Sequence, residues 1–215
     1  EKGKEIYGHE YGMHFPHMRW PAAPDRRLSP IHGKVLKLGG QMGCYNGWER
    51  ANWFAKEGDD LSMESAQTWK RNGPWEKRVK EECEAVRDDV GVLDLPGFSR
   101  FEVKGKDCKN LLNELIVGKL PSTGRISLSY FSDHRGRILT EMSIMKHTDQ
   151  HFTLITAAAA QWHDYELLLS SIHPSSDISV EDKSHEIGTL IVTGPQSRNL
   201  LSKITDADLS LPWLS

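Results

Sequence analysis

RISLSYFSDHRGRILTEMSIM, residues 125–145, alternates apolar and polar side chains on both sides of the turn DHRG. Alternation with a period of two is typical of a strand with one buried face. Gly136 can take the left-handed backbone conformation that a tight turn requires. A further alternating stretch, HFTLITA at residues 151–157, follows closely. The sequence therefore predicts a β-hairpin that a third strand extends into a meander.

Helical periodicity marks two stretches before this meander. In residues 74–90, apolar residues recur every three or four positions and charged residues lie between them. KDCKNLLNELI, residues 106–116, has a capping aspartate and places its leucines on the inward side. Between these two helices, VGVLDL at 90–95 and RFEVKG at 100–105 predict short strands.

Helical spacing returns after the meander, at residues 158–172. Trp162, Tyr165, Leu168 and Leu169 form the apolar face that this spacing predicts. The remaining predicted elements are a strand, GTLIVTG at 188–194, and a helix, QSRNLLSKI at 196–204. Together these patterns predict an α+β fold with a largely antiparallel sheet and helices packed on it.

Residues 1–60 are rich in Gly, Pro, His and Trp and have little sustained period. We expect an extended segment lying over another surface, with one short helix in SPIHGKVLKLGG at 29–40. Residues 58–73 indicate a polar connector. The chain begins without a methionine and stops just after a helical stretch, so we expect a piece of a longer protein.

The composition is that of an ordinary soluble globular protein, with 38% hydrophobic residues, 27% charged residues and a formal charge of -3. The 27 Lys and Arg are interleaved with 30 Asp and Glu, which argues against a nucleic-acid partner. Three widely spaced cysteines favour a reducing compartment. The sequence lacks an apolar run long enough for a membrane span and a signal-peptide pattern, so we expect a cytoplasmic or mitochondrial matrix protein without a membrane partner.

Glu141 is the acid that the strand pattern singles out, because it lies between Ile138 and Ile144 and beside Met142. A carboxyl group among apolar side chains tends to have a raised pKa, which suits proton transfer or hydrogen bonding to a ligand's ring nitrogens. Strand alternation could instead place Glu141 on a solvated face. Both alternatives stay open at the level of sequence.

Other candidate sites are weaker. His9, His14 and His17 share one stretch but match no defined zinc spacing, so we predict no metal site. GPQSR at 194–198 could present backbone N–H groups to an anion, but it lacks the pattern of a phosphate loop and is typical of a strand-to-helix turn. The sequence contains no GxGxxG, so a flavin or nicotinamide dinucleotide would lack a Rossmann turn here.

Several strings together resemble the sarcosine and dimethylglycine dehydrogenases and oxidases, flavoproteins whose second half is similar to the aminomethyltransferase (T protein) of the glycine cleavage system. The motifs are YGMHFPHMRWPAAPDRRLSPIHGKVLKLGG at 11–40, NGWERANWFA at 46–55 and VKEECEAVRDDVGVLDLPGFSRFEVKG at 79–105. SLSYFSDHRGRILTE and IGTLIVTGPQSRNLLSKI carry the resemblance through the rest of the chain.

The resemblance implies a fold like that of the aminomethyltransferase folate-binding domain and an enzyme with two sites. A half that binds FAD, absent from this chain, would oxidise a small methylated amine, and a half that binds tetrahydrofolate would take up the one-carbon unit. Residues 1–60 are similar to the segment that joins the halves. Residues 74–215 resemble the N-terminal part of the folate-binding half.

The resemblance also places Glu141, Leu128 and Ala157 at the folate site, with Glu141 as the catalytic acid or base. The chain departs from the family at two of these positions. Transferases usually have an aspartate where this chain has Glu141, and many have a pterin-contacting asparagine where it has Ala157. A misplaced base lowers the rate, and an alanine side chain cannot hydrogen-bond a pterin. The departures favour an alternative, a non-catalytic regulatory or binding protein with the same architecture.

Overall fold

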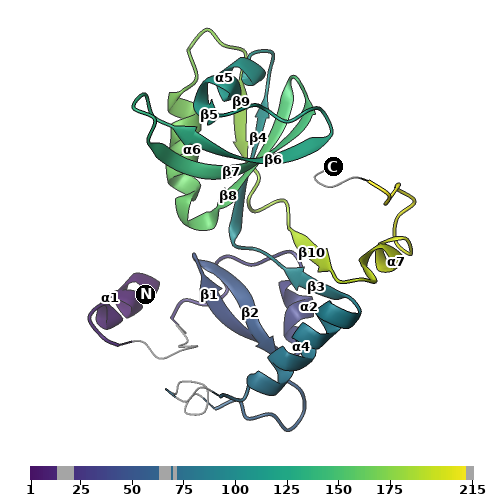
Figure 1. Cartoon of the computed structure of the whole chain (residues 1–215). Helices are drawn as coiled ribbons and strands as arrows, with labels where there is room; N and C mark the ends of the chain where they lie inside the picture. The colour runs from purple at the N-terminus through teal and green to yellow at the C-terminus, as the bar shows by residue number, and fades with distance from the viewer. Residues whose placement is uncertain (14–21, 63–68, 70–71, 212–215) are drawn as a thin grey trace. The chain divides into compact units, whose positions relative to one another are not determined.

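The structure, a computed structural model, describes residues 1–13, 22–62, 69 and 72–211. The chain forms two compact units (Figure 1). Unit 1 comprises residues 1–96 and 188–209, and unit 2 comprises residues 97–187, joined by 210 and 211.

Unit 2 is built on a six-stranded sheet in the order β5-β6-β7-β8-β4-β9, in which every neighbouring pair is antiparallel. The strands are β4 (Phe98–Lys104), β5 (Ile116–Val117), β6 (Arg125–Ser132), β7 (Ile138–Thr148), β8 (His151–Ala157) and β9 (Ser179–Asp182). The helices are α5 (Cys108–Leu115), the 3-10 turn η1 (Ala158–Ala160) and α6 (Gln161–Ser170). The predicted α+β class, hairpin and meander are confirmed.

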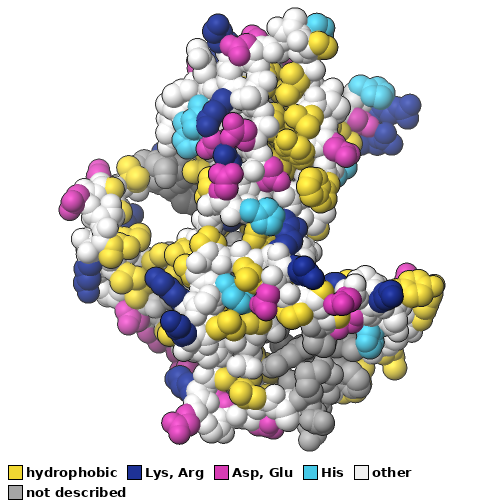
Figure 2. All heavy atoms as spheres, turned by 180° about the vertical axis from the view of Figure 1, so that it is seen from behind, with side chains coloured by type: hydrophobic (Ala, Val, Ile, Leu, Met, Phe, Trp, Pro, Cys, Tyr) yellow, Lys and Arg dark blue, Asp and Glu magenta, His cyan; other side chains and the backbone are white. Residues whose placement is uncertain are grey.

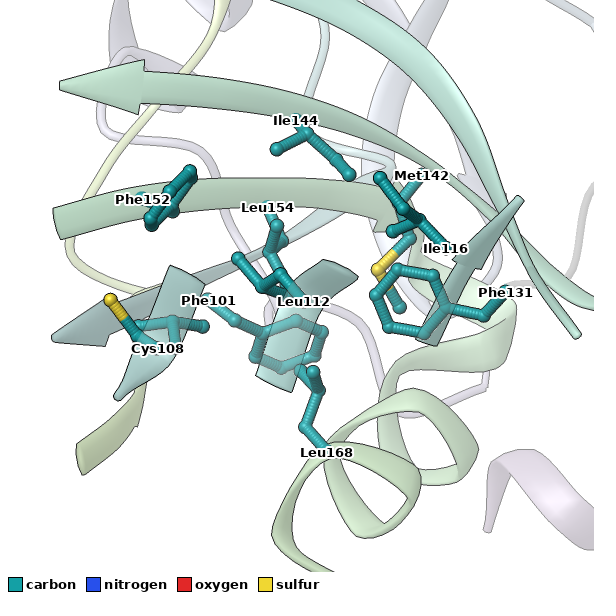
Figure 3. Packing of buried hydrophobic residues seen from close by; sticks show 11 residues of the cluster. Phe101, Cys108, Leu112, Ile116, Phe131, Met142, Ile144, Phe152, Leu154 and Leu168 are labelled. Atoms are coloured by element: carbon teal, nitrogen blue, oxygen red, sulfur yellow. The ribbon is translucent and has the colours of Figure 1, made fainter. Parts of the chain in front are cut away.

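One face of this sheet carries the hydrophobic core of unit 2 (Figure 3). Phe101, Met142 and Leu154 come from three neighbouring strands and are fully buried. Leu112 of α5 and Leu168 of α6 pack against them, so both helices cover the same face. Burial of each such side chain stabilises the fold by about 1.5–3 kcal/mol. The sheet therefore turns the face that carries these side chains toward the two helices.

The hairpin turn between β6 and β7 is closed by Asp133. Its carboxylate accepts hydrogen bonds from the backbone N–H groups of Arg135 at 2.8 Å and Arg137 at 2.9 Å. Gly136 has a φ of +74°, as predicted. The side chain of Arg137 also donates to the same carboxylate at 2.7 Å, and the backbone hydrogen bond from Arg137 together with this one lowers the pKa of Asp133.

Unit 1 contains two separate two-stranded sheets, β1–β2 and β3–β10. Its strands are β1 (Gly40–Tyr45), β2 (Trp48–Phe54), β3 (Gly91–Asp94) and β10 (Leu190–Thr193). Its helices are α1 (Lys2–His9), α2 (His32–Lys37), α4 (Glu76–Asp88) and α7 (Ser197–Leu201). The helices predicted within 29–40, 74–90 and 196–204 are confirmed.

The expectation that residues 1–60 form an extended segment with one helix is wrong. They contain α1 and the hairpin β1–β2 in addition to α2. Asn46 and Gly47 join the two strands with φ angles of +50° and +83°. An Asn-Gly pair with positive φ at both positions suits a tight hairpin turn, but the flanking strands lack the regular alternation that marks a hairpin in sequence.

The predicted apolar faces of two helices are also corrected. On α4, Cys83 is exposed and Val86 is 37% exposed, because this helix lies along an open groove in unit 1. On α6, Trp162 is 69% exposed, whereas Asp164 is fully buried. The inward side of α6 is partly polar because it meets polar side chains of the sheet.

Candidate functional site

The sheet of unit 2 has a second face, opposite the core, which we call the outer face. Successive strand residues point to opposite sides, so the residues between the core positions form it. Its residues on the three meander strands are Ile126, Leu128, Tyr130, Glu141, Ser143, Met145, Thr153, Ile155 and Ala157. The three residues that the sequence assigned to a folate site therefore lie on one face of three adjacent strands.

Glu141 of β7 lies directly opposite Tyr130 of β6 in the ladder. The Glu141 carboxylate raises the pKa of the Tyr130 phenol, through hydrogen bonding first and through its negative charge second. Glu141 is exposed. The structure thus places this acid on the outer face, held by one phenol and free to accept further hydrogen bonds.

Leu128 and Ala157 frame Glu141 with apolar surface. Leu128 is 57% exposed and pairs with Ser143, two residues along β7 from Glu141. Ala157 is exposed at the end of β8 and pairs with Phe98 of β4. An exposed apolar surface beside one carboxylate suits a flat, partly apolar ligand with N–H groups at its edge.

A buried acid lies behind this face. The carboxylate of Asp164 accepts hydrogen bonds from the hydroxyls of Thr140 at 3.0 Å and Thr156 at 2.5 Å. Its other oxygen lies 2.8 Å from Nδ1 of His163. Thr140 and Thr156 immediately precede Glu141 and Ala157 in their strands.

Tyr130 and Asp164 are two site residues that the sequence pattern does not single out. Counting outward from the DHRG turn along the two strands places Tyr130 near Glu141. The bulge at Phe131 and Ser132 shifts the exact register of this pair. Asp164 had one weak signal, its spacing of four residues before Leu168, which puts both on the inward side of α6.

A groove of about 820 Å³ lies elsewhere, in unit 1. It is lined by residues of α4, β3 and β10, including Val86, Val92 and Ile191. Glu141, Leu128 and Ala157 do not line it. We place the candidate site on the outer face because the three residues implied by the resemblance lie there together. Beside the groove, Lys56, Arg78 and Glu81 are paired with one another, and burial raises the pKa of Glu82.

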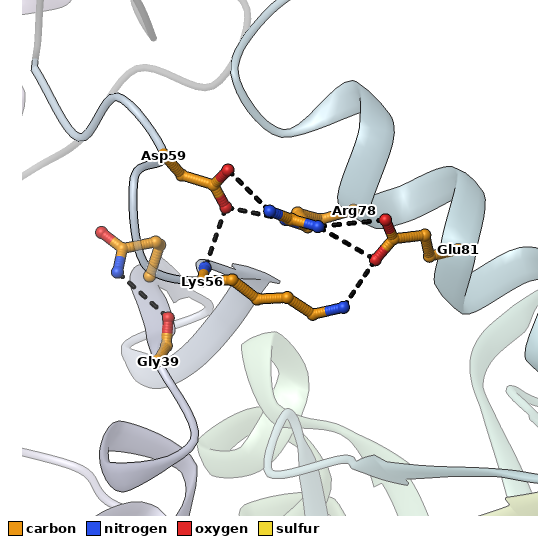
Figure 4. A network of polar contacts seen from close by, with 6 residues as sticks. Gly39, Lys56, Asp59, Arg78 and Glu81 are labelled. Carbon is orange, nitrogen blue, oxygen red and sulfur yellow. Dashed lines mark hydrogen bonds and ion pairs between the residues drawn. The ribbon is translucent and has the colours of Figure 1, made fainter.

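Those paired groups form the network drawn in Figure 4. Arg78 donates to Asp59 at 2.7 and 2.9 Å and to Glu81 at 3.0 Å. Lys56 donates to Glu81 at 2.7 Å. The guanidinium lowers the pKa of Asp59 to about 2. The network ties the turn at 56–59 to α4.

The remaining candidates are the GPQSR stretch and the histidines near the start of the chain. The GPQSR stretch is a strand-to-helix turn, in which the Ser197 hydroxyl donates to the Gly194 carbonyl at 2.6 Å. His14 and His17 lie outside the described residues. Within residues 1–13, 22–62, 69 and 72–211, no group of three His, Cys, Asp or Glu side chains could hold a metal ion.

Acidic and basic side chains are interspersed over the face seen in Figure 2, as their distribution in the sequence predicts. Among the helices of the described part of the chain, none combines the length and apolar character needed to cross a membrane.

Residues 31–215 match the family described as the GCVT N-terminal domain. The dimethylglycine dehydrogenase of Mus musculus mitochondria is 32% identical over 211 residues, which are 97% of this chain and 24% of that protein. The 4-methylaminobutanoate oxidase (formaldehyde-forming) of Paenarthrobacter nicotinovorans is 30% identical over 96% of this chain and 25% of its own length. The chain thus spans about a quarter of these curated relatives, both of which are enzymes.

Among solved structures, the glycine cleavage system aminomethyltransferase T from Bartonella henselae matches with a TM-score of 0.67 and 17% identity. The match covers 88% of this chain and 46% of that one. The fold expected from the resemblance is confirmed.

Proposed function

Because the chain belongs to the GCVT N-terminal domain family, we propose that it is the tetrahydrofolate-binding part of a flavin-dependent enzyme that demethylates a small methylated amine. The observation that carries the proposal is the Glu141–Tyr130 pair on the outer face, with the exposed Leu128 beside it. This arrangement offers one oriented carboxylate within an apolar surface.

The residues present fit a pterin ring in two respects. Apolar side chains such as Leu128 and Ile155 provide contact area for a flat ring, and Glu141 can accept hydrogen bonds from ring N–H groups. Tetrahydrofolate, when bound, supplies the nitrogens that take up the one-carbon unit. Glu141 would orient the ring and accept the proton that one of these nitrogens releases.

Ala157 contributes only its methyl group to this surface. The pterin edge near Ala157 would therefore lack a side-chain hydrogen bond at this position. We propose that binding depends more heavily on Glu141 than it would if a polar residue stood at position 157.

Oxidation of the methylated amine requires the flavin half, which we assign to a part of the protein outside this chain. The partners of residues 1–215 would then be tetrahydrofolate, the amine-derived one-carbon donor and the FAD-binding half of the same protein. The mitochondrial location in the name of the mouse relative supports a matrix location for this protein.

Calorimetric titration of the full-length protein with tetrahydrofolate tests the proposal. We expect saturable binding that Glu141→Ala weakens by at least tenfold, because a hydrogen bond to a charged group contributes about 1.5–3 kcal/mol. Glu114→Ala is the matched control, since Glu114 is an exposed glutamate on α5, which covers the opposite face of the sheet.

Two results would contradict the proposal. If the folded protein gives no heat of binding, the folate assignment fails and the non-catalytic alternative gains support. If both Glu141→Ala and Glu114→Ala bind tetrahydrofolate with the affinity of the unaltered protein, folate binds away from the outer face.

A further inference from the structure

Asp164 is a carboxylate buried completely beneath the sheet of unit 2. Burying a charged group is costly unless hydrogen bonds replace its water. Here the two threonine hydroxyls and the imidazole of His163 supply those bonds. His163 has a side chain that is 56% exposed, so its ring extends from the buried carboxylate to the surface.

The two threonines belong to different strands, at a place where these strands have stopped pairing. The ladder between β7 and β8 ends at the pair Ser143 and Ile155. Nevertheless β7 begins at Ile138 and β8 continues to Ala157. Over the unpaired residues, side chains replace the backbone ladder as the link between the two strands.

Asp164 is the centre of this link. One of its oxygens accepts from Thr140 of β7 and Thr156 of β8, and the Thr156 hydroxyl also lies 3.3 Å from the backbone oxygen of Glu141. Each threonine points to the core face, so the residue that follows it points to the outer face. The carboxylate therefore fixes the spacing between Glu141 and Ala157 from behind.

We infer that Asp164 is a positioning residue that sets Glu141 for the bound folate, an inference that rests on the proposed function. The network of Asp164, Thr140 and Thr156, which we call the acid clamp, holds the beginning of β7 against the end of β8. It acts on Glu141 through the backbone and does not touch the ligand.

Stability alone is a poor explanation of the acid clamp. Replacing a buried polar cluster by apolar groups of similar shape is often neutral or stabilising. An apolar set at these three positions would not fix the separation of two unpaired strands, because it makes no directed bonds. The directed bonds are what a precisely placed acid requires, because small displacements of a catalytic group have large effects.

The test is a double-mutant cycle on the full-length protein, read out as tetrahydrofolate affinity. Asp164→Asn keeps the size of the side chain but removes the negative charge, so the charge-assisted hydrogen bonds from Thr140 and Thr156 become weaker neutral ones. We expect it to weaken binding about tenfold in the unaltered background and to have no further effect when combined with Glu141→Ala. Non-additivity of this kind reports that two residues act as one unit.

Two further variants separate positioning from folding. The triple variant Thr140→Val, Thr156→Val and Asp164→Leu is expected to fold with an unchanged or higher unfolding midpoint and still to bind weakly. Asp182→Asn is the matched control, because Asp182 is a partly buried carboxylate that accepts from Gln161 at 2.5 Å on the far strand β9. It is expected to lower stability and leave affinity unchanged.

The outcomes distinguish this inference from the proposed function. If the unaltered protein binds no tetrahydrofolate, both are overturned. If it binds and Glu141→Ala weakens binding, but Asp164→Asn and the triple variant bind normally, the positioning role is overturned while the proposed function stands. The positioning role is also overturned if the losses of affinity caused by Asp164→Asn and Glu141→Ala add in full in the double variant.

Discussion

Tyr130 and Glu141 face each other across β6 and β7, and the carboxylate raises the pKa of the phenol. The pairing has a directly measurable consequence. In Glu141→Gln, the negative charge is lost, so the pKa of Tyr130 is expected to fall toward the ordinary tyrosine value. Carbon NMR of ring-labelled tyrosine, titrated from neutral to alkaline pH, follows this shift, and an unchanged titration in the variant would exclude the pair.

Tyr130→Phe probes the same contact from the other side. Loss of the phenol leaves the Glu141 carboxylate without the hydrogen bond that orients it. We expect folate affinity to fall about fivefold, since one hydrogen bond contributes about 1 kcal/mol. Leu128→Ala, which removes contact area without touching the carboxylate, should also weaken binding but should leave the Tyr130 titration of the previous experiment unaltered.

The meander of unit 2 could be predicted from sequence because its alternation is regular and Gly136 supplies the turn. On β7 and β8 the core residues alternate with outer ones and are fully buried, whereas on β6 the pattern is reversed, since Leu128 is 57% exposed and Ser129 is 4% exposed. Glu141 follows from the alternation of β7, since it stands beside the core position Met142, whereas the assignment of Leu128 to the site comes from the family resemblance.

Asp164 could not be predicted in this way. An aspartate in a helix is normally exposed. The helical spacing therefore predicts an inward face that includes the more hydrophobic Trp162 and Leu169 and excludes Asp164. The buried position of Asp164 depends on Thr140 and Thr156, which lie far from it in sequence and are themselves unremarkable strand residues. A polar contact between distant segments has no periodic signal.

Acid stability should depend on Asp59 of unit 1. Arg78 lowers the pKa of Asp59 to about 2, below its value in the unfolded chain. The unfolded state therefore binds the proton first, so this contribution to stability is present above pH 4 or so and is lost as the pH falls toward 2. We expect urea unfolding midpoints to decline over this range and Asp59→Asn to flatten the decline. An equally steep decline in the variant would assign it to other carboxyl groups.

His147 predicts a second pH dependence in unit 2. Its ring stacks on His151 with centroids 4.4 Å apart, and burial followed by the charge of His151 lowers the pKa of His147 below 6.5. Because the unfolded chain takes up the proton first, stability is expected to decrease as the pH falls through 6.5 and below. His147→Gln should remove part of this slope in denaturant titrations between neutral and mildly acidic pH. A slope that stays the same in the variant would contradict the prediction.

Gly47 tests the turn of the hairpin formed by β1 and β2. Its φ of +83° is strained for any residue with a Cβ, although a Cβ there would meet only Arg27, at 3.6 Å. Gly47→Ala is therefore expected to destabilise unit 1 by about 1 kcal/mol through the backbone alone. Gly33→Ala is the matched control, because Gly33 lies within α2 with open space around it, and alanine should stabilise that helix by about 0.5–1 kcal/mol. Thermal unfolding of both variants gives the sign of each change in stability. If Gly47→Ala is as stable as the unaltered protein, the turn does not hold this conformation in solution.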